Sequence, residues 1–347
     1  MNLDFDDSIS MHPGVRRQER DKIRSRFIRL VDSKLALHRN APLNRLSIKC
    51  KDDVGPAPVI RWISKVLNRH VTELVLSISS HWSWPLSSEV DSSETMCQEF
   101  WESCSVSSIT LKRLTFHTYP NVNFPLLVEA SLDLRMTHEQ IGQAKLSEDD
   151  IAKEKEGTMV GNATVLLMGI CNVKKLYLSD NTLEVLAFCC KPMPVYNNLV
   201  HLTIKTHRDV EWKSLTALLK NCQNLETLVF DGLLHRYGMN CRSCECLCKP
   251  WEEEDVPTCL SSSPVKVLEI LKFGDICEDE DMDKMMEQVE YFLETMPNLE
   301  QLIIHYETSI DEDVEEVLSQ FQMVSREGLS KCKIQVISDN LNLSSST

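Results

Sequence analysis

The feature that most constrains the fold of this chain is a short apolar pattern, L-x-L/I/F, that recurs along most of its length. Its leading residues are Leu46, Leu74, Leu114, Leu132, Leu176, Leu202, Leu228, Leu268 and Leu302. From Leu176 to Leu202 to Leu228 the interval is 26 residues both times, and elsewhere it runs from 18 to 44. A period of about 20 to 29 residues around an L-x-x-L-x-L core is typical of leucine-rich repeats.

Each repeat of this kind contributes one short strand whose alternate leucines point into a core shared with its neighbours. The strand that includes Leu114 is expected to bury Leu114 and Phe116 in this way. Between the strands the apolar spacing changes from period 2 to period 3.6, as helical crossovers require. An alternation of strand and helix predicts parallel strands. The pattern therefore predicts an α/β fold, a leucine-rich-repeat-like solenoid with a curved, mainly parallel sheet.

Three segments between strands have the apolar spacing of amphipathic helices, namely residues 57–69, 211–221 and 281–296. Their apolar faces are formed by Ile60, Ile63, Val66 and Leu67, by Trp212, Leu215, Leu218 and Leu219, and by Met282, Met285, Met286, Val289, Phe292, Leu293 and Met296. A methionine-rich stripe can form an adaptable binding groove, but packing in a core is the favoured interpretation here. Residues 135–158 are polar and are predicted to leave the solenoid as a mobile excursion.

The charge of the chain is unevenly distributed around a net value of −15. Residues 251–316 carry a balance of −18, whereas residues 10–51 carry +9. The basic residues alternate with apolar ones at helical spacing, which favours a solvated helix face over a nucleic-acid surface. The acidic opening MNLDFDDSIS is not a secretory signal, and no stretch reaches the ~18 apolar residues of a membrane span. We therefore expect a cytoplasmic or nuclear protein that binds neither nucleic acid nor membrane.

Four of the fourteen cysteines, Cys241, Cys244, Cys246 and Cys248, lie within eight residues of one another. They could form a zinc site, with His235 or Cys259 as an additional ligand. Structural zinc usually takes two ligand pairs separated by a dozen or more residues, and C-x-x-C-x-C-x-C does not have that spacing. A polar surface loop with exposed thiols is the favoured interpretation, and a metal site is the alternative.

Motifs that carry catalysis do not occur in the sequence. It has neither a phosphate-binding glycine loop nor a nucleophile elbow nor an H-E-x-x-H helix. The pair Cys189-Cys190 is interpreted as a buried turn, and the acid clusters 278–281 and 311–313 lack the glycine of a calcium loop. The sequence therefore predicts no catalytic residue, no cofactor and no metal ligand.

Residues 259–307 resemble the FBD domain of a plant family, the F-box/FBD/LRR-repeat proteins. The matching motif is a strand led by PVKVL, an acidic turn, an amphipathic helix and a PNLEQL strand. Residues 171–186, 197–204 and 222–235 are similar to the repeats of that family. The resemblance covers nearly the whole chain and implies a protein that holds a substrate for a cullin ubiquitin ligase.

In that family an F-box module, reading roughly L-P-D-x-L, binds a Skp-type adaptor of the ligase. This motif does not occur in the 347 residues. The resemblance therefore implies a shortened receptor that would reach the adaptor and the cullin only through an F-box upstream of Met1.

The sequence predicts five regions. Residues 1–45 form a charged helical linker or N-terminal cap, residues 46–235 degenerate leucine-rich repeats, residues 236–256 a Cys-rich acidic connecting loop, residues 257–338 an FBD-like strand–helix–strand unit that caps the solenoid, and residues 339–347 a disordered tail. The predicted function is non-catalytic recognition of a protein partner. The alternatives are zinc binding through Cys241–Cys248 and a stand-alone repeat scaffold unrelated to ubiquitination. Exposed residues beside the strand leucines, such as Lys205, His207, His305 and Tyr306, are candidates for partner contact.

Overall fold

The computed structural model describes most of the chain in two compact units. One unit comprises Met1–Val173 with Phe188–Pro194, and the other comprises Lys174–Ala187 with Val195–Thr347. The described residues are 1–12, 14–38, 41–51, 54, 56–67, 69–78, 105–115, 122–149, 161–236, 247–248, 259–274, 280–307, 311–327, 332–338 and 342–344. Each unit is an α/β stack of the leucine-rich-repeat kind, with parallel strands that follow one another in chain order.

The first unit contains five parallel strands: β1 (Asn2–Asp6), β2 (Arg45–Cys50), β3 (Glu73–Ile78), β4 (Ser108–Thr115) and β5 (Glu129–Arg135). The register aligns the predicted leucines, since Leu46 lies opposite Leu74 and Ile48 opposite Leu76. All four of these side chains are buried. Residues 1–45, predicted as a charged helical linker or N-terminal cap, therefore also supply a strand. Phe5 of this strand is buried, and Leu3 on the same side is half-buried.

Strand β4 differs from its prediction. Ile109 and Leu111, rather than Leu114 and Phe116, occupy the positions opposite Leu74 and Leu76. A bulge follows, where the register with β5 shifts between Lys112 and Leu114 and Arg113 has a φ of 59°. Leu114 is buried beyond this bulge, opposite Leu134, and Phe116 lies outside the described residues. The predicted burial of Leu114 is therefore confirmed, although Ile109 and Leu111 align with the leucines of β3, because SITLKRLTF contains two overlapping L-x-L-like patterns.

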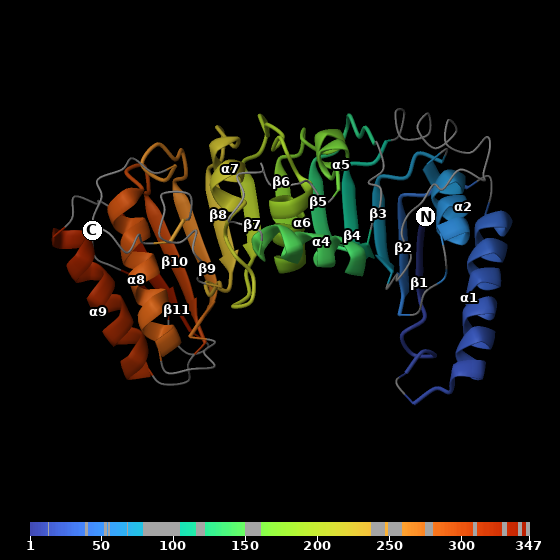
Figure 1. Cartoon of the computed structure of the whole chain (residues 1–347), viewed down its shortest axis with the longest axis horizontal. Coiled ribbons are helices and arrows are strands. Elements are labelled where there is room, and N and C mark those ends of the chain that lie inside the picture. The colour runs from blue at the N-terminus through green and yellow to red at the C-terminus, as the bar shows by residue number, and fades with distance from the viewer. Residues whose placement is uncertain are drawn as a thin grey trace. The chain divides into compact units, whose positions relative to one another are not determined.

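Two helices lie beside the first strands, α1 (Arg17–Leu37) and α2 (Pro56–Leu67) (Figure 1). Phe27 of α1 packs edge-on against Trp62 of α2, with ring centroids 6.4 Å apart. Asp32 of α1 accepts hydrogen bonds from Arg61 at 2.7 Å and from the Trp62 indole at 3.2 Å. This carboxylate therefore joins the two helices through both a charged and a neutral donor.

The polar segment predicted as a mobile excursion instead contains a helix, α4 (His138–Asp149). Its start is a capping box. The backbone N–H of Gln140 donates to Thr137 Oγ1 at 3.1 Å, and the backbone N–H of Thr137 donates to Gln140 Oε1 at 2.8 Å. The signature T-x-x-Q explains why so polar a segment begins a helix. A short helix, α5 (Thr164–Gly169), follows, and residues 150–160 lie outside the described ranges.

The second unit contains six parallel strands and a short antiparallel one. They are β6 (Lys175–Leu178), β7 (His201–Lys205), β8 (Thr227–Asp231), β9 (Val267–Phe273), β10 (Gln301–Tyr306), β11 (Lys333–Ile337) and β12 (Asn342–Ser344). Leu176, Leu202 and Leu228 lie opposite one another, and the register continues to Leu268 and Leu302. Strand β12 lies within the predicted disordered tail, where it covers the free edge of β11 through antiparallel pairing.

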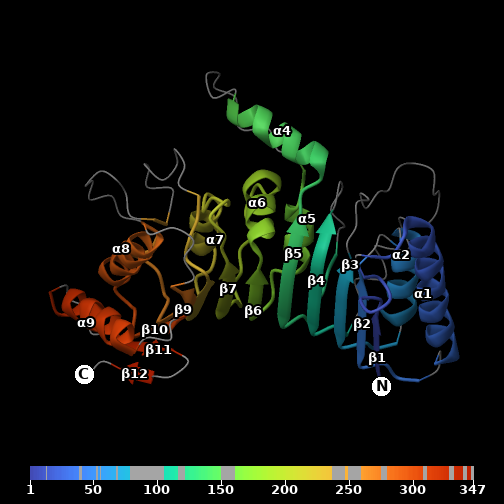
Figure 2. The same cartoon turned by 90° about the horizontal axis from the view of Figure 1, so that it is seen from below.

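The helices of the second unit are α6 (Asp180–Cys189), α7 (Leu215–Lys220), α8 (Glu280–Thr295) and α9 (Asp311–Glu327). Figure 2 shows α6, α7 and α8 on the same side of strands β6–β9. The predicted apolar faces of α7 and α8 are largely buried, although Met282 and Met286 are half-buried and α7 is shorter than the predicted 211–221. Val289, Phe292 and Leu293 carry the core packing of α8.

Aromatic rings form the centre of this core. Trp212 stacks on Phe230 at 5.3 Å, and Phe230 stacks on Phe292 of α8 at 5.6 Å. Phe273 contacts Tyr306 and Phe321 in edge-on geometry. The strand–helix–strand order predicted for residues 259–307 is present as β9, α8 and β10. Within the described ranges, no helix is both long enough and apolar enough to span a bilayer.

Candidate partner-binding site

In the second unit, one face of the sheet carries side chains that the helices leave half-buried. Along strands β6 to β11 the burial alternates, with fully buried side chains on the helix side and half-buried ones between them. We call the second set the open face of the second unit. Its apolar members are Tyr177, Val267, Leu271, Ile303 and Ile337. Val229, at 4% exposure, is covered by its neighbours.

The middle of this open face combines apolar and charged groups. The parallel register places Val229 beside Glu269 and Glu269 beside Ile303. His305 Nε2 lies 2.8 Å from Glu269 Oε1, and both side chains remain partly exposed. A partner that lies across β9 and β10 would therefore meet Val267, Leu271 and Ile303 around one polar pair, a mixture of apolar and polar groups such as protein interfaces contain.

The corresponding face of the first unit is polar. Arg45 lies between Asp4 at 3.5 Å and Glu73 at 3.1 Å, and Lys49 lies 3.7 Å from Asp6. Serine, threonine and further charged side chains fill most of the remaining places, and Val75 on β3 is a half-buried apolar residue among them. Such a face keeps favourable contact with water and gives a partner little apolar area to bury.

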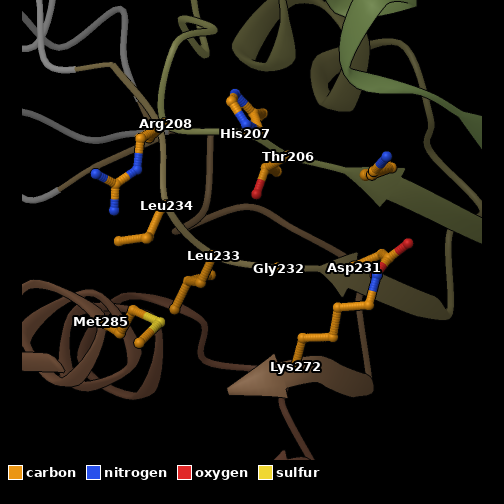
Figure 3. A pocket seen from close by; sticks show the side chains of 10 residues that line it. Thr206, His207, Arg208, Asp231, Gly232, Leu233, Leu234, Lys272 and Met285 are labelled. Atoms are coloured by element: carbon orange, nitrogen blue, oxygen red, sulfur yellow. The ribbon is translucent and has the colours of Figure 1, made fainter. Parts of the chain in front are cut away.

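A cavity of about 190 Å³ lies where strands β7, β8 and β9 reach their carboxyl ends. It is lined by Lys205–Arg208, by Asp231–Leu234, by Lys272 and by Met285 of α8. Figure 3 shows Thr206 and Arg208 on one side of the cavity and Gly232–Leu234 with Met285 across from them. The carboxyl ends of parallel strands are the usual position of ligand sites in open α/β sheets.

Each of the three lysine and arginine side chains in the lining lies in an ion pair. Arg208 lies 2.5 Å from Asp281, whose side chain is 7% exposed, and Lys272 Nζ lies 2.6 Å from Asp231 Oδ1. The Lys272 contact is an ion pair without the geometry of a hydrogen bond. Lys205 lies 4.0 Å from Asp180, the loosest of the three pairings. Lys272 occupies a bulge of β9 with a φ of 56°.

The hydroxyl of Thr206 is a buried polar group inside this cavity. Thr206 is 7% exposed, and its Oγ1 has no hydrogen-bond partner. In Figure 3 the hydroxyl points from the loop after β7 toward the Gly232–Leu234 segment. Gly232 has a φ of 86°, and a Cβ there would lie 3.4 Å from Thr206 Oγ1, so this glycine keeps both the turn and the space beside the hydroxyl. Buried hydroxyls normally find a partner, which makes this one a candidate for contact with a ligand.

The four exposed candidates from the sequence have different positions. Lys205 and His207 both line the cavity, which the sequence did not predict. His305 lies on the open face, paired with Glu269. Tyr306 is 9% exposed and packs on Phe273, so its prediction as an exposed contact residue was wrong. Leu302, Ile304 and Tyr306 alternate along β10, so Tyr306 lies on the buried side of this strand.

The cysteine cluster is only partly within the described residues, because Cys241, Cys244 and Cys246 lie outside them. Cys248 is buried at 3% exposure, and the carbonyl of the adjacent Leu247 accepts a hydrogen bond from Gln288 of α8 at 3.1 Å. The prediction of an exposed thiol was therefore wrong for Cys248. Its neighbour Leu247 is also buried, at 1% exposure.

The two residues considered as additional zinc ligands are His235 and Cys259. His235 is buried and stacks on Trp212 at 4.1 Å. Burial raises the pKa of the Cys259 thiol, although the charge of Lys220 and a hydrogen bond with Thr216 oppose that shift. Among the residues with described positions, no group of three or more His, Cys, Asp and Glu side chains could hold a metal ion. The zinc alternative depends on Cys241, Cys244 and Cys246, which lie outside the described residues, so it stays a prediction.

The remaining candidates from the sequence are the pair Cys189-Cys190 and two acid clusters. Cys189 and Cys190 are buried, as interpreted, and burial raises the pKa of the Cys190 thiol against an opposing hydrogen bond from Thr164. Of the acid cluster 278–281, Asp281 pairs with Arg208, and the side chains of the other acids lie outside the described residues. The side chains of cluster 311–313 are also outside them.

Known proteins resemble this chain along nearly its whole length. No protein-family model matches it. A putative F-box protein from Arabidopsis thaliana is 39% identical over 452 residues, which covers 99% of this chain and 89% of the relative. An F-box/LRR-repeat protein of the same plant is 41% identical over 431 residues, covering 99% of this chain and 87% of the relative. A putative F-box/FBD/LRR-repeat protein from that plant is 39% identical over 428 residues, with 97% and 82% covered.

Proposed function

This chain belongs to the plant family of F-box/LRR-repeat proteins, and from that premise we propose that it is a non-catalytic module that binds another protein. The names of two of the relatives combine a repeat region with an F-box, and the resemblance of residues 259–307 to an FBD domain fits the same family. We assign this chain the substrate-recognition half of an SCF-type ubiquitin ligase. Contact with a Skp-type adaptor would need an F-box joined to it.

The open face of the second unit is the surface that we assign to the partner. The observation that supports this assignment is the half-buried apolar set around Glu269, particularly Val267, Leu271 and Ile303. Burial of apolar area on such a face is the main favourable term in protein association, at roughly 25 cal/mol per Å² of apolar surface. The polar face of the first unit offers less of this area.

We also assign the protein to the cytoplasm or nucleus, where thiols stay reduced. The described cysteines support this location because they are free thiols, and several of them are buried. Burial raises the pKa of Cys222 to about 12, so this thiol stays protonated at neutral pH and acts as a small core residue.

One substitution on the open face of the second unit and a matched one on the corresponding face of the first unit test the proposed function. Ile303→Lys places a cation beside Glu269 on the open face of the second unit, and Val75→Lys is the matched change on β3 of the first unit. Tagged wild-type and variant chains are expressed in plant cells at equal levels, and bound proteins are quantified by mass spectrometry. We expect a specific partner to be retained by wild type and Val75→Lys and reduced at least about tenfold with Ile303→Lys.

Two outcomes would contradict the proposal. One is an identical set of bound proteins for all three chains, which would exclude the open face of the second unit as the partner surface. The other is selective loss with Val75→Lys, which would move the surface to the first unit. Thermal unfolding of both variants is measured alongside, so that a folding defect is separated from loss of the interface. Once the partner is known, its ubiquitination by the chain joined to an F-box tests the ligase role.

A further inference from the structure

The cavity at the carboxyl ends of β7–β9 has the properties of a binding site for a small ligand, independent of whether the open face binds a protein. We propose that this cavity binds a carboxylate attached to a small apolar group. Its volume of about 190 Å³ exceeds the ~150 Å³ of an apolar cavity that binds benzene, so a single aromatic or branched aliphatic group fits.

One cation of the lining is available to an anion. Lys205, Arg208 and Lys272 form ion pairs with Asp180, Asp281 and Asp231, so these six side chains together are neutral. The Lys205–Asp180 pair is the longest of the three, at 4.0 Å. An incoming carboxylate would therefore compete with Asp180 for Lys205.

A hydrogen-bond donor is already in place for the carboxylate. The Thr206 hydroxyl is more than nine-tenths buried and without a hydrogen-bond partner, and it faces the space that Gly232 leaves open. A carboxylate oxygen can accept the hydroxyl proton and a lysine proton together, and hydrogen bonds to a charged acceptor are roughly twice as strong as neutral ones. The ligand would thus satisfy a group that costs free energy when it is left unpaired.

The other wall of the cavity is apolar. Leu233, Leu234 and Met285 lie on the side away from Lys272 and Asp231 (Figure 3). Leu233 is 3% exposed and Met285 is 1% exposed, so this wall is held by the core of the second unit. Methionine adapts its shape to the group that it contacts. The wall therefore accepts the apolar part of the ligand while the carboxylate faces Thr206 and Lys205.

Two sources could supply this chemistry, a free small acid or the C-terminal residue of a peptide. The test uses the full chain with four probes: benzoate, its neutral analogue benzamide, and the peptide Ala-Ala-Ala-Phe with either a free or an amidated C-terminus. Dissociation constants are measured by ligand-observed NMR titration. We expect at least about tenfold tighter binding of the free acid than of its amide in one or both pairs. Binding of benzoate alone indicates a free metabolite, and binding of the acidic peptide alone indicates a chain terminus.

Substitutions in the lining test whether the ligand binds in this cavity. Thr206→Val removes the unpaired hydroxyl and keeps the shape of the side chain, so we expect an unchanged or higher melting temperature with about five- to tenfold weaker binding of the acid. Lys205→Gln is expected to weaken binding of the acid by a similar factor and leave binding of the amide unchanged. Thr203→Val, three residues before Thr206 on β7 and outside the lining, is the control matched to Thr206→Val and should bind as wild type.

Three results would overturn the proposal. These are equal affinity for acid and amide in both pairs, equal affinity of wild type and Thr206→Val, and no saturable binding of any probe up to ~10 mM, a concentration at which even very weak ligands bind. Partner capture by the Ile303→Lys variant does not enter these measurements. Failure here therefore leaves the proposed protein-binding role unaffected.

Discussion

The two units of this chain share a backbone plan and differ in the chemistry of their open faces. Both stack parallel strands whose buried residues lie in register, and both carry a bulge near the end of one strand, at Arg113 in β4 and at Lys272 in β9. The open face of the first unit is a ladder of charges and hydroxyls, whereas that of the second unit adds half-buried apolar side chains such as Val267, Leu271 and Ile303 to its polar ones. The buried half of each strand fixes the fold, so the other half is free to differ in function.

The largest expected effect tests whether the two units unfold separately. Trp62 and Trp212 are each almost fully buried, one in each unit. Alanine at either position should lower the free energy of unfolding by about 3–5 kcal/mol through lost burial and a residual cavity. Hydrogen exchange read by mass spectrometry should show lost protection in β2–β3 for Trp62→Ala and in β7–β9 for Trp212→Ala. Equal loss across both units with either variant would mean that the chain unfolds as one cooperative block.

The next effect compares two ion pairs of different burial. Arg208→Ala leaves the carboxylate of Asp281, which is 7% exposed, without its cation and should cost about 3 kcal/mol. Arg61→Ala removes one of two cations from Asp32, whose side chain is 28% exposed, and should cost ~0.5–1 kcal/mol. Urea unfolding of both variants measures the difference. Similar losses would show that water reaches Asp281 as readily as Asp32.

The two bulges predict effects of opposite sign. Arg113 and Lys272 both have left-handed backbone conformations that glycine adopts without strain. Arg113→Gly relieves this strain and should stabilise the first unit by ~0.5–1 kcal/mol. Little is lost in exchange, because the contact of Arg113 with Ser77 at 3.3 Å is a weak hydrogen bond. Lys272→Gly gains the same relief but removes the ion pair with Asp231, so it should destabilise by about 1 kcal/mol. Melting temperatures of the two variants decide this, and a gain for both would mean that the Lys272 pair adds nothing.

The smallest effect depends on pH and belongs to the first unit. Burial alone would raise the pKa of Asp32, but hydrogen bonds and charges from Arg61 and Lys65 outweigh it and hold that pKa below its ordinary value. A lowered folded-state pKa stabilises the protein above the unfolded value of ~3.9, and this stabilisation is lost as the pH falls through the folded value. Asp32→Asn should therefore lower the melting temperature at pH 7 and by a smaller amount at pH 3. A difference that does not change with pH would assign the role of Asp32 to packing.

The sequence predicts the buried half of each strand well because a leucine pattern depends on local alternation alone. The interval of 26 residues from Leu176 to Leu202 to Leu228 becomes a direct register in the second unit. At β4 the same rule selected Leu114 instead of Ile109, since the extra residue of a bulge cannot be read from alternation. The helix α4 could have been predicted from the capping signature at Thr137 and Gln140.

The cavity could not be predicted in this way. Thr206, Gly232 and Lys272 are far apart in the sequence, and they meet only because three parallel strands end together. The pairing of Arg208 with Asp281 across 73 residues is equally non-local. No local signal marks a hydroxyl that will be buried without a partner. Lys205 and His207 were identified as exposed residues, but the site they share required the three-dimensional arrangement.

The register of the strands also has a consequence for how such a chain can change in evolution. Leu228 and Leu268 are 40 residues apart and still lie directly opposite each other, as do Leu202 and Leu228 at 26. The alignment with one relative spans 452 residues although this chain has 347, so that relative carries additional residues with no counterpart here. Because side-chain packing and not connection length sets the register, insertions and deletions between strands are absorbed where they occur. Each crossover can thus vary its length while the stack of strands on either side is inherited intact.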